Sequence, residues 1–163
     1  MGLFGDLDAA AVNSNPFFVA QDDYEAVVSK AEYRVSRDGQ RQLYIEYTIT
    51  DVNSEYQGQK LQKYFPLVAE DMNEQKMALL PPAEKKEIQK NNAALKRALC
   101  GNEGSANQPG LGVNPDDLNS DDWKPESLIN TPVIVAVQNY GPNNQGVAVK
   151  WANVIQDPSD LDK

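Results

Sequence analysis

Aromatic and basic side chains are interleaved between residues 30 and 65, and they are the residues of this chain best suited to chemistry. Proteins hold single-stranded nucleic acid without strong sequence preference by stacking bases on aromatic rings and contacting phosphates with cations. Each stacked base contributes roughly 1–3 kcal/mol. The pattern therefore predicts a nucleic-acid-binding surface. Its expected members are Arg34, Arg41, Tyr44, Tyr56, Lys60, Tyr64, Lys150 and Trp151.

Tyr44 is the strongest candidate for base stacking, because it lies opposite the apolar face of its predicted strand. Tyr64 and Lys60 share one face of the following strand and are expected beside it. Lys150 is the only base of the last predicted hairpin and is expected to close the groove. A single tyrosine more often packs in a core or on its rim. Tyr47, which shares the apolar face of its strand, is assigned to the core.

The sequence offers little to an active site. It contains no histidine, which removes the most common general base, the most common zinc ligand and any catalytic triad that uses histidine. The glycine-flanked turn at residues 141–146 lacks the Lys-Ser/Thr pair of a phosphate-binding loop. Three pairs of adjacent aspartates lack the spacing of a calcium loop. We therefore expect a binding protein that is not an enzyme and that holds no metal or cofactor.

The acidic residues are gathered toward the two ends of the chain. The formal net charge is −9, but residues 1–25 hold five acids and no base, and residues 101–163 carry a net charge of −6. Residues 26–100 carry a net charge of +2. A nucleic-acid role therefore cannot rest on the overall charge, but the middle of the chain is locally basic. An ordinary solvated acidic surface explains this distribution equally well.

Composition predicts one domain in a reducing compartment. A hydrophobic content of 40% over 163 residues is enough for one domain with its own core. The single cysteine, Cys100, excludes an internal disulfide and fits a reducing environment. The first twenty residues lack the pattern of a secretory signal, and no apolar run reaches the length of a membrane span. We expect a cytoplasmic protein.

Hydrophobic periodicity predicts three strands in the first half of the chain. Residues 24–35, 42–51 and 59–65 are rich in β-branched and aromatic side chains, which favour strands. The second of these segments alternates apolar and polar side chains cleanly. Gly39 follows an aspartate between the first two segments, and Asp-Gly supplies the backbone conformation that a tight hairpin needs. The three segments therefore predict a meander.

A polar insert separates this meander from a final hairpin. Residues 69–80 and 83–100 have helical spacing, broken at Pro81 because proline lacks an amide donor and its ring clashes with the preceding turn. Residues 101–127 are rich in Gly, Asn, Pro and Asp and are expected to form a loop. Residues 127–155 return to a β pattern with one turn in the middle.

Five short strands interrupted by a helix are what a small Greek-key barrel of the oligonucleotide-binding type requires. We therefore predict a mainly β fold: a five-stranded barrel of this type, with a helical insert and loop at about residues 69–127 between its third and fourth strands. The domain is expected over residues 24–156, after an N-terminal arm of residues 1–23, and both acidic termini are expected to be flexible. In the last strand, one face is expected to carry Val147, Val149 and Trp151.

Residues 157–163 form an acidic C-terminal tail with three aspartates around one leucine. Such a peptide can occupy the protein's own basic groove at low salt, or bind a basic pocket on a replication or recombination protein. An ordinary solvated terminus explains the composition as well. The residues expected to contact a partner are Asp157, Asp160, Leu161 and Asp162.

Several short segments resemble a family of phage-encoded single-stranded-DNA-binding proteins with an oligonucleotide-binding barrel. The similar elements are Asn-Pro-Phe-Phe before the first strand, Leu-Tyr-Ile-Glu-Tyr-Thr-Ile at 43–49, Tyr-Gln-Gly-Gln at 56–59 before a Tyr-Phe pair, and a last hairpin ending in Val-Lys-Trp at 149–151. The resemblance spans about residues 15–156 and is a pattern of strands and turns. It implies sequence-independent protection of single strands during phage replication or recombination in the host cytoplasm, without metal or nucleotide cofactor.

Two other classes of protein fit the same features. An acidic β-barrel with an extended arm and a long loop suits a phage virion component, such as a capsid decoration or connector protein. A small inhibitor that mimics DNA with its acidic surface would bind a basic enzyme and no DNA. Binding to oligo-dT separates the first reading from both, because counterion release makes such binding fall steeply with salt. The oligomeric state and the choice between DNA and RNA stay open.

Overall fold

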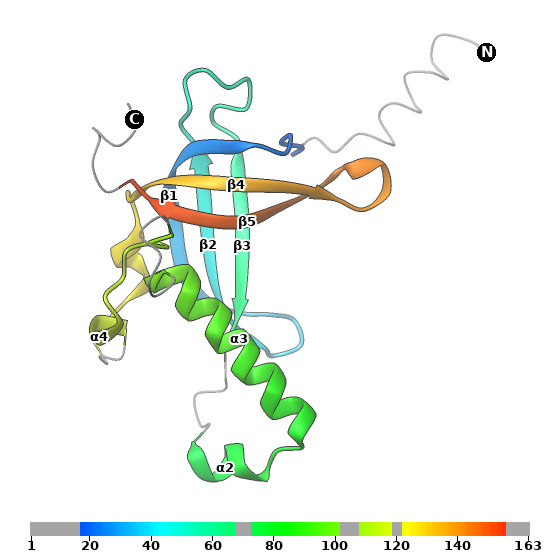
Figure 1. Ribbon diagram of the computed structural model, residues 1–163, viewed down its shortest axis with the longest axis vertical. Coiled ribbons are helices and arrows are strands. Elements are labelled where there is room, and N and C mark those ends of the chain that lie inside the picture. Colours follow the sequence, from blue (N-terminus) through cyan, green and yellow to red (C-terminus); the bar gives the residue numbers. More distant parts are fainter. Residues whose placement is uncertain (1–16, 68–72, 102–107, 119–121, 156–163) are drawn as a thin grey trace, which may run out of the picture.

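A computed structural model of the protein describes residues 17–67, 73–101, 108–118 and 122–155. Within these residues the chain forms a five-stranded antiparallel sheet in the order β3-β2-β1-β4-β5 (Figure 1). The predicted strands, the hairpin pairing and the helix between the third and fourth strands are confirmed. The strands are β1 (Asp23–Val35), β2 (Arg41–Ile49), β3 (Lys60–Pro66), β4 (Pro132–Tyr140) and β5 (Gly146–Val154).

The strands of the meander, β1, β2 and β3, are joined by a short turn and by a longer one at residues 50–59. Between β1 and β2 the backbone amide of Ser36 donates to the carbonyl of Gln40 at 2.8 Å, and Gly39 takes a φ of +81°. That left-handed conformation is the one for which glycine is suited, as the Asp-Gly pair predicted. Gly58, with a φ of +89°, closes the turn into β3 by donating to the carbonyl of Ile49 at 2.8 Å.

Strand β1 belongs to both halves of the sheet. Its first residues, Asp23–Val27, pair with β4, and its residues from Ala26 onward pair with β2. The register shifts between Val28 and Lys30, so that one extra residue, Ser29, forms a bulge. A bulge bends a strand and increases its twist. In Figure 1, β1 curves accordingly, and the β4–β5 hairpin crosses the meander instead of continuing it.

The sheet does not close into a barrel. Strands β3 and β5 are its two edges, and no hydrogen-bonded ladder joins them in the described residues. Their Cα atoms nevertheless approach within 8 Å of each other. The two edges therefore face each other across a narrow gap.

Among the described residues, the two longest helices lie between β3 and β4. The first, α2 (Glu74–Leu79), is shorter than the predicted helix at 69–80, whose residues up to 72 lie outside the described part. The second, α3 (Pro82–Cys100), begins directly after Pro81 and ends at Gly101, whose φ is +86°. The last turns of α3 pack on the sheet, where Leu95, Ala98 and Leu99 contact the core. In Figure 1 the rest of the helix extends away from the strands.

The segment predicted as one long loop contains two short helical turns, α4 (Pro115–Leu118) and a 3-10 turn at Pro125–Leu128. Its residues 108–113 run beside the last turn of α3, since the amides of Leu111 and Val113 donate to carbonyls of that helix at 3.0 and 2.9 Å. The same stretch covers the end of β5, where the Val154 amide donates to the Gly110 carbonyl at 2.7 Å. This loop therefore ties α3 to β5.

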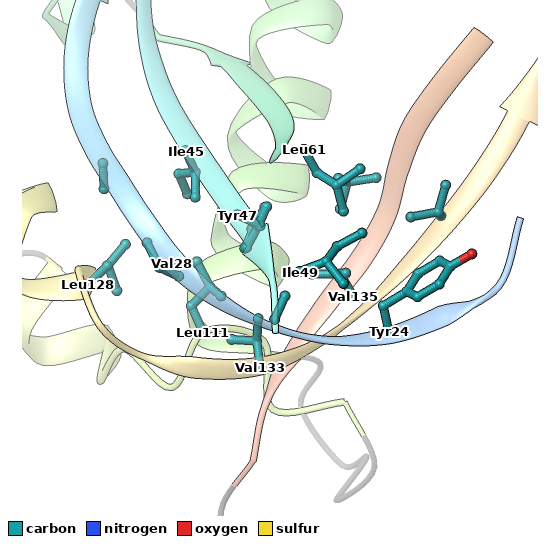
Figure 2. Packing of buried hydrophobic residues seen from close by; sticks show 14 of the residues in the cluster. Tyr24, Val28, Ile45, Tyr47, Ile49, Leu61, Leu111, Leu128, Val133 and Val135 are labelled. Atoms are coloured by element: carbon teal, nitrogen blue, oxygen red, sulfur yellow. The ribbon is translucent and has the colours of Figure 1, made fainter. Parts of the chain in front are cut away.

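The core lies between the meander and the β4–β5 hairpin (Figure 2). Alternate residues of β2 enter it, including Ile45 and Tyr47, as the alternating pattern predicted. Val19, from the predicted N-terminal arm, is fully buried in the same cluster, so the packed domain begins before β1. Burial alone raises the pKa of the Tyr47 hydroxyl, which therefore stays protonated.

The prediction that Trp151 shares one face of β5 with Val147 and Val149 is wrong. Strand β5 carries an extra residue where Val149 pairs with Val137 and Trp151 pairs with Ala136, which leaves Lys150 as a bulge. A one-residue shift moves every following side chain to the opposite face. Val149 is buried in the core, but Trp151 is 37% exposed and lies on the other side.

Candidate nucleic-acid interface

The outer side of the meander gathers half of the predicted site residues. We call this surface the meander face and define it by nine side chains of β1–β3 that lie opposite the core. Cross-strand pairing places Tyr44 opposite Tyr64 and Thr48 opposite Lys60, so the predicted neighbours do meet. The nine residues are Lys30, Glu32, Arg34, Tyr44, Glu46, Thr48, Lys60, Gln62 and Tyr64.

Three side chains from three strands stack on one another at the centre of the meander face. The guanidinium carbon of Arg34 lies 3.6 Å from the centroid of the Tyr44 ring. The Tyr44 and Tyr64 ring centroids are 4.9 Å apart, with the rings tilted by 45°. Arginine on a ring face and tilted aromatic pairs are both attractive arrangements. Tyr44 therefore contacts both Arg34 and Tyr64.

The expectation that Tyr44 offers an open ring is wrong. Tyr44 does lie on the outer side of β2, but only 1% of its surface is exposed, because Arg34 and Tyr64 cover it. Its hydroxyl donates to Glu46 Oε1 at 3.2 Å, and burial followed by the nearby Glu46 charge raises the pKa of Tyr44. Tyr64 is 43% exposed. Tyr64 is therefore the accessible ring of this face, and the buried ring of Tyr44 packs against it.

Carboxylates accompany the cations of the meander face. Arg34 donates through Nε to Glu32 Oε1 at 2.8 Å, and its terminal nitrogen lies 2.6 Å from the same oxygen. Lys30 Nζ is 3.7 Å from Glu32, and Lys60 Nζ is 3.9 Å from Glu46. Each of the three cations is thus ion-paired. Exposed pairs of this kind are weak, so a phosphate can replace the carboxylate, at some cost in affinity.

Glu32 and Glu46 differ in how firmly the fold holds them. The Arg34 hydrogen bond is the main reason that the pKa of Glu32 is lowered, so Glu32 stays ionised throughout the neutral range. Glu46 is mostly covered and accepts hydrogen bonds from Ser29 Oγ at 3.0 Å and from the Tyr44 hydroxyl. Glu46 is therefore part of the framework around the β1 bulge, whereas Glu32 only neutralises cations.

Two of the other predicted residues lie away from this face. Arg41 is on the side of β2 that carries the core residues, at the end of the strand, with its guanidinium carbon 5.8 Å from the ring centroid of Tyr33. Tyr56 follows β2 and packs edge-on against Phe18 and Tyr24, with centroid distances of 6.3 and 6.1 Å. The prediction that both share one surface with Tyr64 is therefore wrong. Strand parity places Arg41 on the other side of the sheet, and Tyr56 lies in the loop after β2.

Lys150 and Trp151 lie at a separate place, the gap between β3 and β5. They line a pocket of about 300 Å³, which we call the edge pocket. The expectation that Lys150 closes a groove with Tyr64 is therefore not met. Sequence reasoning missed the role of α3 here, since a helix residue reaches the site only through its packing. The charged and aromatic residues of this pocket are Tyr47, Lys63, Phe65, Arg97, Lys150 and Trp151.

The predicted tail residues Asp157, Asp160, Leu161 and Asp162 lie outside the described residues. None of the described helices combines the length and the apolar composition needed to cross a membrane. Over the same described ranges, no cluster of three or more His, Cys, Asp or Glu side chains is arranged to hold a metal ion.

The chain was also compared with known protein families and with curated proteins, and neither comparison finds a match. A function must therefore be inferred from the geometry of the meander face and the edge pocket.

Proposed function

We propose that this protein binds single-stranded DNA without sequence preference, with the meander face as its binding surface. In this proposal bases stack on Tyr64, and Arg34, Lys30 and Lys60 contact the phosphates. Such a module would protect single strands during replication or recombination, as the resemblance to the phage proteins suggests. The acidic tail at residues 157–163 would recruit a replication or recombination partner, or compete with DNA for the protein's own cations.

The observation that carries the proposal is the ordered stack of Arg34, Tyr44 and Tyr64. A base-stacking platform needs a flat, partly exposed ring with cations nearby. Tyr64 provides the ring, and Tyr44 fixes it at a centroid distance of 4.9 Å. Arg34 lies against the Tyr44 ring and adds both a planar group and a charge. A rigid platform loses little freedom on binding, which favours affinity.

The order of the strands supports an oligonucleotide-binding type of architecture. Strand β4 pairs beside β1 of the meander. A Greek key would need this neighbour relation, so the pairing supports the proposal. Proteins of the oligonucleotide-binding fold use a five-stranded, partly open barrel and bind their ligands on the face of strands 2 and 3. The meander face includes that surface, since Tyr44 and Tyr64 come from β2 and β3. We infer that the gap between β3 and β5 is the opening of such a barrel.

Titration of labelled oligo-dT at two salt concentrations tests the proposed function. For single strands, the logarithm of the binding constant falls by about 0.7 per phosphate contact for each tenfold rise in salt. Three cations on the meander face therefore predict a slope of about −2, which weakens binding roughly 15-fold between about 50 and 200 mM salt. Fluorescence anisotropy measures both affinities directly. A duplex of equal length should bind more weakly, because its bases are not free to stack.

Absence of oligo-dT binding at low salt would contradict the proposal and favour a virion component. That alternative is favoured by the two edge strands, β3 and β5, whose outer edges pair with no other strand in the part of the chain that the structure describes. Exposed edges can pair with neighbouring subunits. A virion component should be present in purified particles. Binding to a basic enzyme without any binding to DNA would instead favour an inhibitor that mimics DNA.

Replacing Glu32 with glutamine is expected to strengthen oligo-dT binding roughly two- to fivefold. The change removes the carboxylate that neutralises Arg34 and Lys30, so both cations become free for phosphate. Glutamine keeps the size of the side chain and can still accept a hydrogen bond from Arg34. Anisotropy at low salt gives the affinity, and the salt slope should become steeper.

The matched control is Glu84→Gln, which removes the same charge from the first turn of α3, away from the meander face. It should leave the affinity near that of the wild type. Equal gains in the two variants would mean that overall charge, and not this surface, governs binding.

A further inference from the structure

The edge pocket collects positive charge in a chain whose net charge is −9. Lys63 from β3, Arg97 from α3 and Lys150 from β5 all line it, and none of the described residues that line it is acidic. These three residues come from distant parts of the sequence, and the approach of β3 and β5 brings them together. The pocket is therefore a local concentration of positive charge.

The cations of the edge pocket differ from those of the meander face in their partners. On the meander face each cation is ion-paired with Glu32 or Glu46. Across the described ranges of the chain, no carboxylate lies within ion-pair distance of Lys63, Arg97 or Lys150. The Lys63 ammonium instead lies 5.6 Å from the centroid of the Phe65 ring. An incoming anion thus has no carboxylate of the described residues to displace here.

The backbone directs these groups toward the gap. Lys150 is the extra residue of the β5 bulge, and bulges turn a side chain away from the regular alternation of a strand. Arg97 lies in the last turn of α3, where loop residues 108–113 hold the helix against the end of β5. Ala94 and Ala98 line the pocket on the same helix, and their small side chains leave its volume open.

Aromatic groups and one hydroxyl complete the pocket. Trp151 is 37% exposed and lines it, so its ring is available to a planar ligand. Tyr47 also lines it, although only 2% of its surface is exposed. Burial raises the pKa of the Tyr47 hydroxyl, which is consequently a hydrogen-bond donor at neutral pH. The volume of about 300 Å³ is at the small end of the range for small-molecule sites.

We propose that the edge pocket binds one nucleoside monophosphate unit, with its phosphate between Lys63, Arg97 and Lys150 and its base against Trp151. The unit is either a free nucleotide or the phosphorylated end of a strand, since both present the same chemistry. This site is distinct from the meander face, and it stands whether or not single strands bind there. The pocket is too small to hold a folded protein, and its three cations favour an anionic ligand.

Intrinsic fluorescence of Trp151 measures the binding of deoxythymidine monophosphate. The chain has two tryptophans, and Trp123→Phe leaves Trp151 as the single reporter. The expected result is saturable quenching with a submillimolar dissociation constant, at least tenfold tighter than for thymidine or inorganic phosphate alone. Calorimetric titration of the unsubstituted chain gives the same affinity without reliance on the Trp123→Phe variant.

Variants assign the binding to the pocket. Lys63→Gln and Lys150→Gln should each weaken deoxythymidine monophosphate binding at least fivefold, and Tyr47→Phe should weaken it by a smaller factor. Lys30→Gln, which removes the same charge from the meander face, is the matched control and should bind as the wild type does. Tyr64→Ala should also retain nucleotide binding. Loss of oligo-dT binding at the meander face can therefore be distinguished from loss of nucleotide binding in the edge pocket.

Oligo-dT with and without a terminal phosphate separates the two sources of the ligand. Competition that requires the terminal phosphate assigns the pocket to a strand end, and competition by the free nucleotide alone assigns it to a free nucleotide; both outcomes support the site. The proposal is overturned if the wild type shows no saturable binding by either method. It is equally overturned if thymidine binds as tightly as its monophosphate, or if the Lys63 and Lys150 variants bind normally.

Discussion

Tyr64→Ala should weaken oligo-dT binding about 5- to 150-fold while leaving the fold intact. The ring is 43% exposed on the meander face, and loss of one base–aromatic stack costs roughly 1–3 kcal/mol, which corresponds to this range in dissociation constant. Tyr64 lies on the edge strand β3, so its removal leaves the core unchanged. Its contact with Tyr44 is lost, but aromatic pairs contribute only about 0.5–1.5 kcal/mol. Anisotropy titration measures the affinity, and circular dichroism checks the fold.

Tyr33→Ala is the matched control for this substitution. Tyr33 is 50% exposed and has an arginine, Arg41, near its ring, but it lies on the other side of the sheet. The affinity of this variant should stay within about twofold of the wild type. If Tyr33→Ala lost as much affinity as Tyr64→Ala, the binding surface would not be the meander face.

Gly110→Ala should destabilise the protein by about 3–4 kcal/mol. Gly110 has a φ of +62°, where an L side chain costs roughly 1–2 kcal/mol. A Cβ atom there would lie 2.6 Å from the Ala98 carbonyl oxygen and 2.8 Å from the Gly101 nitrogen, both backbone atoms that cannot move aside easily. The loop must therefore shift, and the bonds it makes are each worth about 1 kcal/mol. Urea denaturation gives the free energy of unfolding.

Those bonds connect three elements, which explains the size of the expected effect. The Gly110 amide donates to Asn153 Oδ1 at 2.9 Å, and its carbonyl accepts from Val154 at 2.7 Å, so β5 depends on it. The next residue, Leu111, donates to the Ala98 carbonyl of α3 at 3.0 Å. The edge pocket should also lose its shape in this variant, because Arg97 is on the same helix turn.

Gly141→Ala separates backbone strain from close packing. Gly141 has a φ of +75°, but a Cβ atom there would meet nothing within 4 Å. It should therefore cost only the strain, about 1–2 kcal/mol. Equal losses in the two variants would show that the contacts around Gly110 contribute nothing to stability.

The sequence was sufficient to predict the strands, because each has a clear period of two or a turn signal at its end. The alternation in β2 correctly predicted Ile45 and Tyr47 as core residues and Tyr44 as facing outward. The Asp-Gly turn and the Pro81 break were also correct. Local signals of this kind depend on neighbouring residues alone and need no knowledge of tertiary structure.

Features that depend on tertiary contacts could not be predicted. Whether Tyr44 is open or covered depends on Arg34 and Tyr64, which lie ten and twenty residues away and reach it only across strands. The extra residue at Lys150 leaves no mark in the sequence, and it reverses the facing of Trp151. The edge pocket requires the approach of β3, β5 and α3, and only Lys150 and Trp151 of its residues were anticipated.

Photo-cross-linking of oligo-dT that carries 5-iodo-deoxyuridine, followed by mass spectrometry, tests most directly whether single strands lie on the meander face. Iodouracil reacts with aromatic side chains that stack on it. We expect the principal cross-link at Tyr64, and we expect it to disappear at high salt together with binding. Cross-links confined to Tyr33, to Tyr140 or to α3, or no cross-link under conditions where binding is measured, would contradict the assignment of this surface.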